Sequence, residues 1–413
     1  MSLATVDASC RGCGAFGVQR FLSLGELPLP DALLTSDQLD EPEARYPVEV
    51  AFCERCSLVQ LLHEVSREKM FVDNYLYFSS FSDDVLDHAR RHAEGLIFDR
   101  DLGPDSFVVE VASNDGYLLQ NFVQADIPSL GIDPSPGPAA AARDSGIDTL
   151  EEFFGVDLAQ RLAASGPRAD VIVANNVMAH VPDLDDFVAG LAVLLGDDGV
   201  ITVENPSVRS LLEERAFDTI YHEHFCYFSC TSVDRLVERH SLHLNHVESF
   251  PRLHGGTLRW HISKRPGRTP ELERALTDEL DAGLTRLDYY TGFGAQVGAI
   301  REALLGLLRG LKDQGRTIAA YGAAAKGTVL LNYVGLDSQL LDFVVDRNVH
   351  KQGLYMPGVH LPILAPEALL ERRPDDTLLL AWNFADEILR QQTEYLSTGG
   401  RFIRPLPWPE VLA

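Results

Sequence analysis

Short apolar runs rich in β-branched residues alternate with helical stretches over two long parts of this chain. The first part has expected strands at 107–111, 130–133, 171–174 and 200–204, with helical stretches near 116–123, 137–144, 156–164 and 184–195. The second has expected strands at 317–321, 341–345, 377–381 and 402–404, with helical stretches near 325–333, 366–371 and 385–396. Strands that alternate with helices form mostly parallel sheets covered by helices on both faces. The pattern predicts an α/β protein with two such sheets.

The remaining segments complete three units. Residues 1–70 look loop-rich, because prolines punctuate them, and so small a unit is marginal without a staple. Residues 71–100 look helical after an aromatic start, 243–250 and 257–263 look like a pair of strands, and 271–312 look like amphipathic helices between two units. We therefore expect an N-terminal unit at 1–70, a central unit at 71–265 and a C-terminal unit at 266–413.

Two Cys-x-x-Cys pairs, Cys10/Cys13 and Cys53/Cys56, lie near the two ends of the N-terminal unit. Four thiolates suit a tetrahedral zinc ion, and each tight turn supplies two of them. With no further ligand nearby, a closed structural zinc site fits better than a catalytic one. The alternative is four free thiols. The other two cysteines, Cys226 and Cys230, are expected to be ordinary buried thiols.

The bulk composition excludes several classes of partner. The 413 residues include 61 acidic and 35 basic ones, for a net charge of −26, and such a surface repels nucleic acid. No apolar run approaches the roughly 20 residues that span a bilayer, and the N-terminus lacks a basic stretch followed by an apolar one. We expect a cytoplasmic protein with no nucleic-acid or membrane partner.

The turn after the first expected strand of the central unit is a candidate cofactor site, because open α/β sheets bind ligands there. Glu110 inside the strand is typical of S-adenosylmethionine sites, although Ala112 and Asn114 stand where glycines are common. Acids and amides at later strand ends could hold the ribose and the methionine end. The predicted cofactor-binding residues are Glu110, Ala112, Asn114, Asp115, Gly116, Asp133, Pro134, Phe153, Asn175 and Asn176. The alternative is an α/β core without a cofactor.

The segment Tyr221-His222-Glu223-His224 packs a phenol and three titratable side chains into four residues. The two histidines lack the spacing of a zinc-protease helix, so general acid/base work fits better. The arrangement needs a histidine oriented by a carboxylate and a tyrosine that donates to developing charge. His180 follows an earlier strand and could face the same crevice. The alternative is that one or two of these histidines are hydrogen-bonded structural groups.

A second strand-to-helix turn, residues 320–328, contains Tyr321, Gly322 and Lys326. A lysine at such a turn suits a pyrophosphate. Arg347 and Asn383 lie at later strand ends of the same unit. We expect this unit to bind a diphosphate and a nucleotide; the alternative is an α/β unit that binds nothing.

The motifs occur together in an order that resembles the sugar C-methyltransferases of deoxysugar pathways in antibiotic biosynthesis. They are the Cys-x-x-Cys pairs, Glu-Val-Ala-Ser-Asn-Asp-Gly, Asn-Asn-Val-x-Ala-His-Val, Tyr-His-Glu-His-Phe and Tyr-Gly-Ala-Ala-Ala-Lys-Gly, and they span nearly the whole chain. The resemblance implies an N-terminal zinc-binding domain, a central class I methyltransferase-like (Rossmann-type) domain and a C-terminal Rossmann-like domain that helps to hold the sugar nucleotide.

The resemblance also implies roles for particular residues. His224 would be the base, with Tyr221, Glu223 and His180 around it, and Tyr75, Ser79 and Ser82 would border the sugar. Lys326, Tyr321, Arg347 and Asn383 would contact the rest of the substrate. The reaction would move a methyl group from S-adenosylmethionine to the carbon beside the ketone, C-3 by family analogy, of a dTDP-linked 4-keto-deoxysugar.

Three rivals stay open at this point. The protein could be an O- or N-methyltransferase on a related sugar, an enzyme that reduces the ketone with a nicotinamide, or a zinc-stapled S-adenosylmethionine-binding protein without activity of its own. We expect a monomer, structural zinc and S-adenosylmethionine as cofactor.

Overall fold

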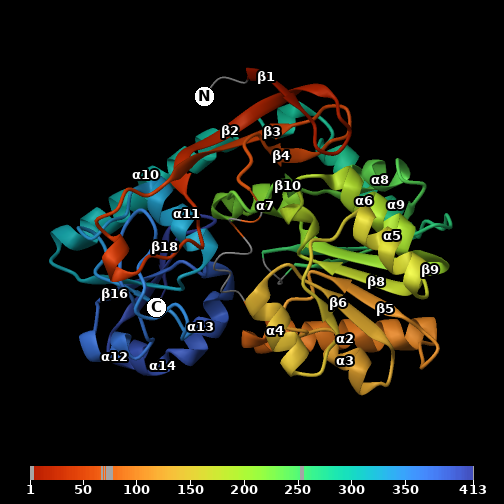
Figure 1. Cartoon of the computed structure of the whole chain (residues 1–413). Helices are drawn as coiled ribbons and strands as arrows, with labels where there is room; N and C mark the ends of the chain where they lie inside the picture. The colour runs from red at the N-terminus through yellow and green to blue at the C-terminus, as the bar shows by residue number, and fades with distance from the viewer. Residues whose placement is uncertain (1–3, 67, 69, 71–77, 252–254, 413) are drawn as a thin grey trace.

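The computed structural model describes residues 4–412 apart from 67, 69, 71–77 and 252–254. Within these residues the strands form three sheets, which confirms the predicted α/β class. Figure 1 shows the central unit (orange to green) beside the C-terminal unit (blue), with the N-terminal strands lying across both.

The N-terminal sheet is antiparallel and has the order β1-β2-β3-β4-β10. Its strands are β1 (Ala4–Ser9), β2 (Phe16–Pro28), β3 (Arg45–Phe52), β4 (Val59–Leu61) and, from the central unit, β10 (Cys226–Tyr227). The expectation of a loop-rich segment was therefore wrong. The prolines misled it: Pro28 ends β2, and Pro47 lies where β3 has only one neighbour, because β4 pairs only with Val50–Phe52.

The central sheet has the order β11-β12-β9-β8-β5-β6-β7, and its strand order reverses at β5. The first five strands in sequence are parallel, and β12 runs antiparallel to both of its neighbours. The strands are β5 (Val108–Val111), β6 (Ser129–Ile132), β7 (Thr149–Leu150), β8 (Ala169–Asn175), β9 (Leu195–Pro206), β11 (His243–Phe250) and β12 (Thr257–Ser263). A crevice is expected beyond the carboxyl end of β5.

The C-terminal sheet repeats this plan with the order β15-β14-β13-β16-β17-β18 and a reversal at β13. Its strands are parallel except for the last. They are β13 (Ile318–Tyr321), β14 (Val344–Val345), β15 (Ile363–Leu364), β16 (Asp376–Leu379), β17 (Arg401–Arg404) and β18 (Glu410–Leu412). A second crevice is expected beyond the carboxyl end of β13, where the chain leads into the helix Ala325–Val334.

Helices cover both parallel sheets. In the central unit they are α2 (Asp83–Arg100), α3 (Gln120–Gln124), α4 (Pro136–Asp144), α5 (Val156–Ser165), α6 (Leu184–Leu194), α7 (Val208–Glu213) and α8 (Cys230–Glu238). They continue with α9 (Pro270–Ala282), α10 (Phe293–Asp313), α11 (Ala325–Val334), α12 (Ala368–Arg372), α13 (Ala385–Gln391) and α14 (Thr393–Ser397). None of these described helices combines the length and the apolar character needed to cross a bilayer.

The helix expected at 116–123 begins later, because α3 starts at Gln120. Ala112, Asn114 and Gly116 have positive φ angles of 59°, 50° and 79°. Such residues cannot continue a right-handed helix, so the turn after β5 extends further than the sequence suggested.

The N-terminal sheet joins the two other units. The rings of Phe52 and Tyr290 stack with centroids 4.4 Å apart, and Phe21 packs 5.2 Å from Tyr290, so β2 and β3 share a core with α10 and the C-terminal sheet. Beyond these strands, the zinc-site cysteines pack into the core of the central unit. The N-terminal unit therefore belongs to both cores.

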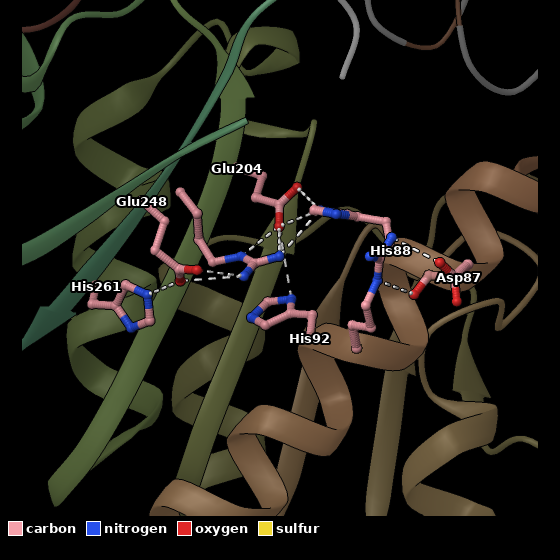
Figure 2. A network of polar contacts seen from close by, with 8 residues as sticks. Asp87, His88, His92, Glu204, Glu248 and His261 are labelled. Carbon is pink, nitrogen blue, oxygen red and sulfur yellow. Dashed lines mark hydrogen bonds and ion pairs between the residues drawn. The ribbon is translucent and has the colours of Figure 1, made fainter. Parts of the chain in front are cut away.

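A charged network fastens α2 to the antiparallel edge of the central sheet (Figure 2). Arg259 on β12 is buried; its guanidinium contacts Glu204 on β9 and lies 3.2 Å from Glu248 on β11. His88 on α2 lies 3.0 Å from Glu204. Burial opposes ionisation here, but the His88 hydrogen bond and Arg259 lower the pKa of Glu204 to about 2. The network fixes the helix whose first turn, near Ser82, reaches the cavity described next.

Candidate active site

The four N-terminal cysteines meet in one cluster whose sulfur atoms all lie within 4.8 Å of one another. Cys10 Sγ is 3.4 Å from Cys56 Sγ, and Cys13 Sγ is 3.7 Å from Cys53 Sγ. A tetrahedral zinc with Zn–S bonds of about 2.3 Å separates its sulfurs by roughly 3.8 Å, so the set fits zinc. Both Cys-x-x-Cys turns close with the same backbone hydrogen bond. The N–H four residues after the first cysteine donates to the carbonyl of that cysteine, from Gly14 to Cys10 and from Ser57 to Cys53.

A cavity of about 680 Å³ lies between the central and C-terminal units. The ends of β5, β6 and β8 contribute to its wall through Val111, Ile132 and Asn175, and Asp31 comes from the N-terminal unit. Ala324, Lys326, Asp346 and neighbouring residues supply the C-terminal side. The four zinc-site cysteines are not among the described residues that line the cavity, as expected for a structural metal.

The turn after β5 keeps the backbone of a glycine-rich loop without most of the glycines. Ala112, Asn114 and Gly116 all have positive φ, and an alanine in this region is strained. Two side chains hold the turn: Asp133 accepts the N–H of Asn114 at 2.9 Å and of Ser135 at 2.8 Å, and Asn114 Oδ1 accepts the N–H of Ser79 at 2.9 Å. Backbone strain kept in place at a cavity wall indicates a ligand site.

Buried polar atoms without partners cluster at the same strand ends. Both carboxyl oxygens of Glu110, Asn175 Oδ1 and Asn205 Oδ1 have no hydrogen-bond partner among the described residues. Glu110 is fully buried, and burial followed by the charges of Asp133 and Asp115 raises its pKa well above the usual range. Asn175 and Asn205 line the cavity, and their free acceptors suit a ligand that brings hydrogen-bond donors, such as the ammonium and hydroxyl groups of S-adenosylmethionine. These two acceptors therefore fit this cofactor.

The structure divides the ten predicted cofactor residues into two groups. Those that line the cavity are Ala112, Asn114, Asp133, Pro134, Phe153, Asn175 and Asn176. Those outside its lining are Glu110, Asp115 and Gly116. The last three lie behind the wall: Glu110 is within β5, and Asp115 Oδ2 accepts the N–H of Ser80 at 3.1 Å.

The predicted catalytic residues come together on one side of the cavity. His224 Nδ1 lies 2.8 Å from the carbonyl oxygen of Thr219. A carbonyl only accepts, so Nδ1 carries the proton and Nε2 is the basic nitrogen of the neutral ring. The ring of Tyr221 lies 4.1 Å from that of His224, and the ring of His180 lies 4.8 Å away, between centroids. All three residues line the cavity.

The orienting group of His224 differs from the expectation. We expected a carboxylate, but the partner is the Thr219 carbonyl. The backbone carbonyl of Glu223 instead accepts the Nδ1–H of His180 at 2.8 Å, and burial lowers the pKa of His180 to about 4. His222 points elsewhere, and its Nε2 lies 3.0 Å from the carbonyl oxygen of Tyr46. It fits the alternative of a hydrogen-bonded structural histidine.

Sequence reasoning missed a charged group around Glu223. The Glu223 carboxyl lines the cavity, and burial, then Asp31, raises its pKa well above the usual range while Lys351 opposes the shift. Lys351 Nζ lies 3.7 Å from Asp31 and donates to the carbonyl of Ala323 at 2.8 Å. The three residues come from three units and follow no local pattern. In the sequence, only their acidic or basic side chains indicate that these three residues could take part in a site.

The C-terminal unit repeats the hydrogen-bonded turn that Asp133 holds in the central unit. Asp346 follows β14 as Asp133 follows β6, and it accepts the N–H of Ala323 at 2.6 Å and of Asn348 at 2.7 Å. Ala323 lies in the turn after β13, which leads into α11. The sequence places Asp346 at a strand end, and its position after the second strand of its unit, as for Asp133, is the signal that relates the two acids.

The predicted substrate residues fall at different places. Ser79, Ser82, Lys326, Arg347 and Asn383 line the cavity. Lys326 Nζ donates to Asn383 Oδ1 at 2.7 Å and lies 4.8 Å above the ring of Trp382. Tyr321 is outside the lining; it is buried in the C-terminal core against Phe402. Tyr75 lies outside the described residues.

Three family models match successive parts of the chain. A zinc binding domain model matches residues 10–71, a methyltransferase domain model matches 88–247, and a C-methyltransferase C-terminal domain model matches 252–407. They confirm the predicted zinc site, the S-adenosylmethionine cofactor and the C-methyltransferase activity.

Individual proteins resemble the chain to different extents. The C-methyltransferase NovU of Streptomyces niveus is 34% identical over 409 residues, which are 98% of this chain and 96% of that protein. A ubiquinone biosynthesis O-methyltransferase of Azorhizobium caulinodans is 24% identical over 25% of this chain and 42% of its own length. The magnesium protoporphyrin IX methyltransferase of Synechocystis with bound SAM is 14% identical, covers 48% of this chain and 89% of that chain, and has a TM-score of 0.35. The chain therefore belongs to the family of S-adenosylmethionine-dependent C-methyltransferases that carry an N-terminal zinc-binding domain.

Proposed function

We propose that the protein methylates the carbon beside the ketone of a dTDP-linked 4-keto-deoxysugar, at C-3, with His224 as the base. The observation that carries this proposal is the hydrogen bond from His224 Nδ1 to the Thr219 carbonyl, which makes Nε2 the basic nitrogen. The ring belongs to the wall of a cavity that also reaches the cofactor turn and the C-terminal unit.

The chemistry needs a base and a stabilised oxygen. His224 Nε2 takes the proton from the carbon, and the electron pair of the broken C–H bond moves toward the ketone oxygen as an enolate. The Tyr221 hydroxyl donates to that oxygen, and such donors are worth most in a buried site. S-adenosylmethionine, when bound, supplies the methyl group that the carbon accepts. His224 then releases its proton to solvent.

The nucleotide part of the substrate is assigned to the C-terminal side of the cavity. Lys326 stands at the start of α11 and brings positive charge where a diphosphate would lie. Asp346 has the geometry of Asp133 and could accept the ribose hydroxyl of a nucleoside. Arg347 and Asn383 complete this side.

We propose that the protein acts as a monomer. Four thiols that must stay reduced support a cytoplasmic location.

The decisive experiment incubates the protein with S-adenosylmethionine and a panel of dTDP-4-keto-deoxysugars. We expect a mass gain of one methylene and a new C–CH₃ signal in the product NMR spectrum. An O–CH₃ or N–CH₃ signal would contradict the proposal, as would consumption of NADPH without methylation.

The base is tested by His224→Asn, which keeps the approximate shape and loses the proton-accepting nitrogen. Methylation and solvent deuterium exchange at the sugar carbon should both fall by roughly 10²–10⁴-fold. His222→Asn is the matched control, because His222 bonds to Tyr46 and lies outside the cavity lining. Exchange at the wild-type rate in the His224 variant would assign the base elsewhere.

A further inference from the structure

A hydrogen bond between the central and C-terminal units lies close in sequence to His224, the proposed base. Trp382, the first residue of the 3-10 turn Trp382–Phe384 that follows β16, donates its Nε1–H to Asp218 Oδ2 at 2.7 Å. Asp218 belongs to the 3-10 turn Phe217–Thr219 and is completely buried. Its second oxygen, Oδ1, has no partner among the described residues. Besides Trp382, the backbone of Asp218 and Thr219 and the charge of Lys326 act on this buried carboxyl. Removing one partner of a buried charged group is costly, so the contact with Trp382 couples the two units.

The residue that follows Asp218 orients the base. Thr219 supplies the carbonyl that accepts His224 Nδ1–H, and its own hydroxyl donates to the carbonyl of Ala216 at 2.7 Å. Phe217, on the other side of Asp218, packs on Tyr333 of α11 with ring centroids 5.2 Å apart. The C-terminal unit therefore contacts the turn at the two positions before Thr219.

The same contact reaches the predicted diphosphate side of the cavity. Lys326 Nζ lies over the ring of Trp382 and donates to Asn383, the next residue. Burial raises the pKa of Asp218 to about 6, although Lys326 and the Trp382 N–H act against the rise. Lys326 and His224 are thus connected through Trp382, Asp218 and Thr219.

We propose that Asp218 is a positioning residue for the base: by anchoring Trp382 across the two units, it holds the Thr219 carbonyl in register with His224 Nδ1. This inference rests on the proposed role of His224. It makes the alignment of the base depend on how the C-terminal unit, with Lys326, is seated against the central unit.

Three variants of the full chain test this role. Asp218→Ala removes the acceptor, Trp382→Phe removes the donor but keeps a ring beneath Lys326, and Asp218→Asn keeps an oxygen that can accept from the indole. A displacement of about 1 Å can cost 10²-fold in rate. We expect Asp218→Ala and Trp382→Phe to lower kcat and deuterium exchange by roughly tenfold to hundredfold, with unchanged S-adenosylmethionine affinity. Asp218→Asn should restore most of the rate.

A spectroscopic readout separates positioning from general stability. The Nδ1–H proton of His224, assigned by its loss in His224→Asn, should shift in Asp218→Ala and Trp382→Phe and return toward its wild-type position in Asp218→Asn. The double variant should be no slower than either single one, because both remove the same bond. If Asp218→Ala does not fold, Trp382→Phe decides.

Wild-type exchange and an unmoved Nδ1–H signal in Trp382→Phe would overturn the inference while leaving the base assignment intact. Failure of the base assignment looks different, because His224→Asn itself would then retain exchange.

Discussion

Asp133 and Asp346 offer a paired test of the two ligand sites. Each carboxyl follows the second strand of its unit, lines the cavity and accepts two backbone N–H groups. If Asp133 also accepts the ribose hydroxyls of S-adenosylmethionine and Asp346 those of the sugar nucleotide, then Asp133→Asn and Asp346→Asn should each weaken one ligand only.

The magnitude follows from the acceptor count. A carboxylate has about four acceptor positions, of which two are used here by backbone N–H groups at 2.8–2.9 Å in Asp133 and 2.6–2.7 Å in Asp346. The amide keeps one oxygen and brings an NH₂ group against a backbone donor. The loss of one charged hydrogen bond costs about 1.5–3 kcal/mol, or roughly tenfold to over a hundredfold in Kd.

Titration calorimetry with S-adenosylmethionine and with a dTDP-4-keto-deoxysugar measures both constants for each variant. Each variant is the control for the other, because the same substitution is made in the same local geometry. Equal weakening of both ligands by either variant would mean that the cavity is disturbed as a whole. Unchanged S-adenosylmethionine affinity in Asp133→Asn would refute the ribose assignment.

Three further predictions concern other sites. Metal analysis should find one tightly bound zinc, and Cys53→Ser should lose both zinc and thermal stability; a metal-free wild-type protein would contradict the site. Lys326→Ala should raise the KM for the sugar nucleotide with a smaller effect on S-adenosylmethionine, and an unchanged KM would show that the diphosphate lies elsewhere. His92 is buried, and burial lowers its pKa to about 3 from the ordinary 6.5. Between these values the unfolded chain binds a proton that the folded protein does not, so the free energy of unfolding falls as pH falls from 6.5 toward 3. His92→Leu should remove this part of the loss. Urea unfolding at several pH values measures the free energy of unfolding of both proteins, and an equal dependence on pH in the two would contradict the prediction.

Regular elements with a clear period could be predicted from the sequence. The strands expected at 243–250 and 257–263 match β11 and β12 residue for residue, and in β12 the apolar Leu258, Trp260 and Ile262 alternate with polar residues at the strand period. The N-terminal strands could not be predicted in the same way. Their core partners, such as Tyr290, lie more than 200 residues away in sequence, so no local window contains the reason for their burial.

The candidate site shows the same division. Asn114 and Asp133 could be predicted, because both follow strands at the spacing of a nucleotide-type fold, and their hydrogen bond joins them in the structure. Asp31 and Lys351 lie in connections between elements and meet Glu223 only through the packing of three units. The orienting group of His224 was also missed, because a backbone carbonyl such as that of Thr219 has no signature in the sequence.

The sheet that carries the zinc site is hydrogen-bonded to the segment that contains His224, the proposed base. Cys53 and Cys56 lie in the turn between β3 and β4, and β4 pairs with β10, in which Cys226 lies opposite Gln60. The link continues to His224, because Leu61 donates its N–H to the carbonyl of Phe225 at 2.8 Å, and Phe225 follows His224. Thr219 holds the other side of His224 from a turn anchored in the C-terminal unit. The segment that contains His224 is thus held from two directions, by the sheet that carries the four cysteines and by the C-terminal unit. Loss of zinc should therefore lower kcat more than it lowers S-adenosylmethionine affinity, because the cofactor turn after β5 lies in neither connection.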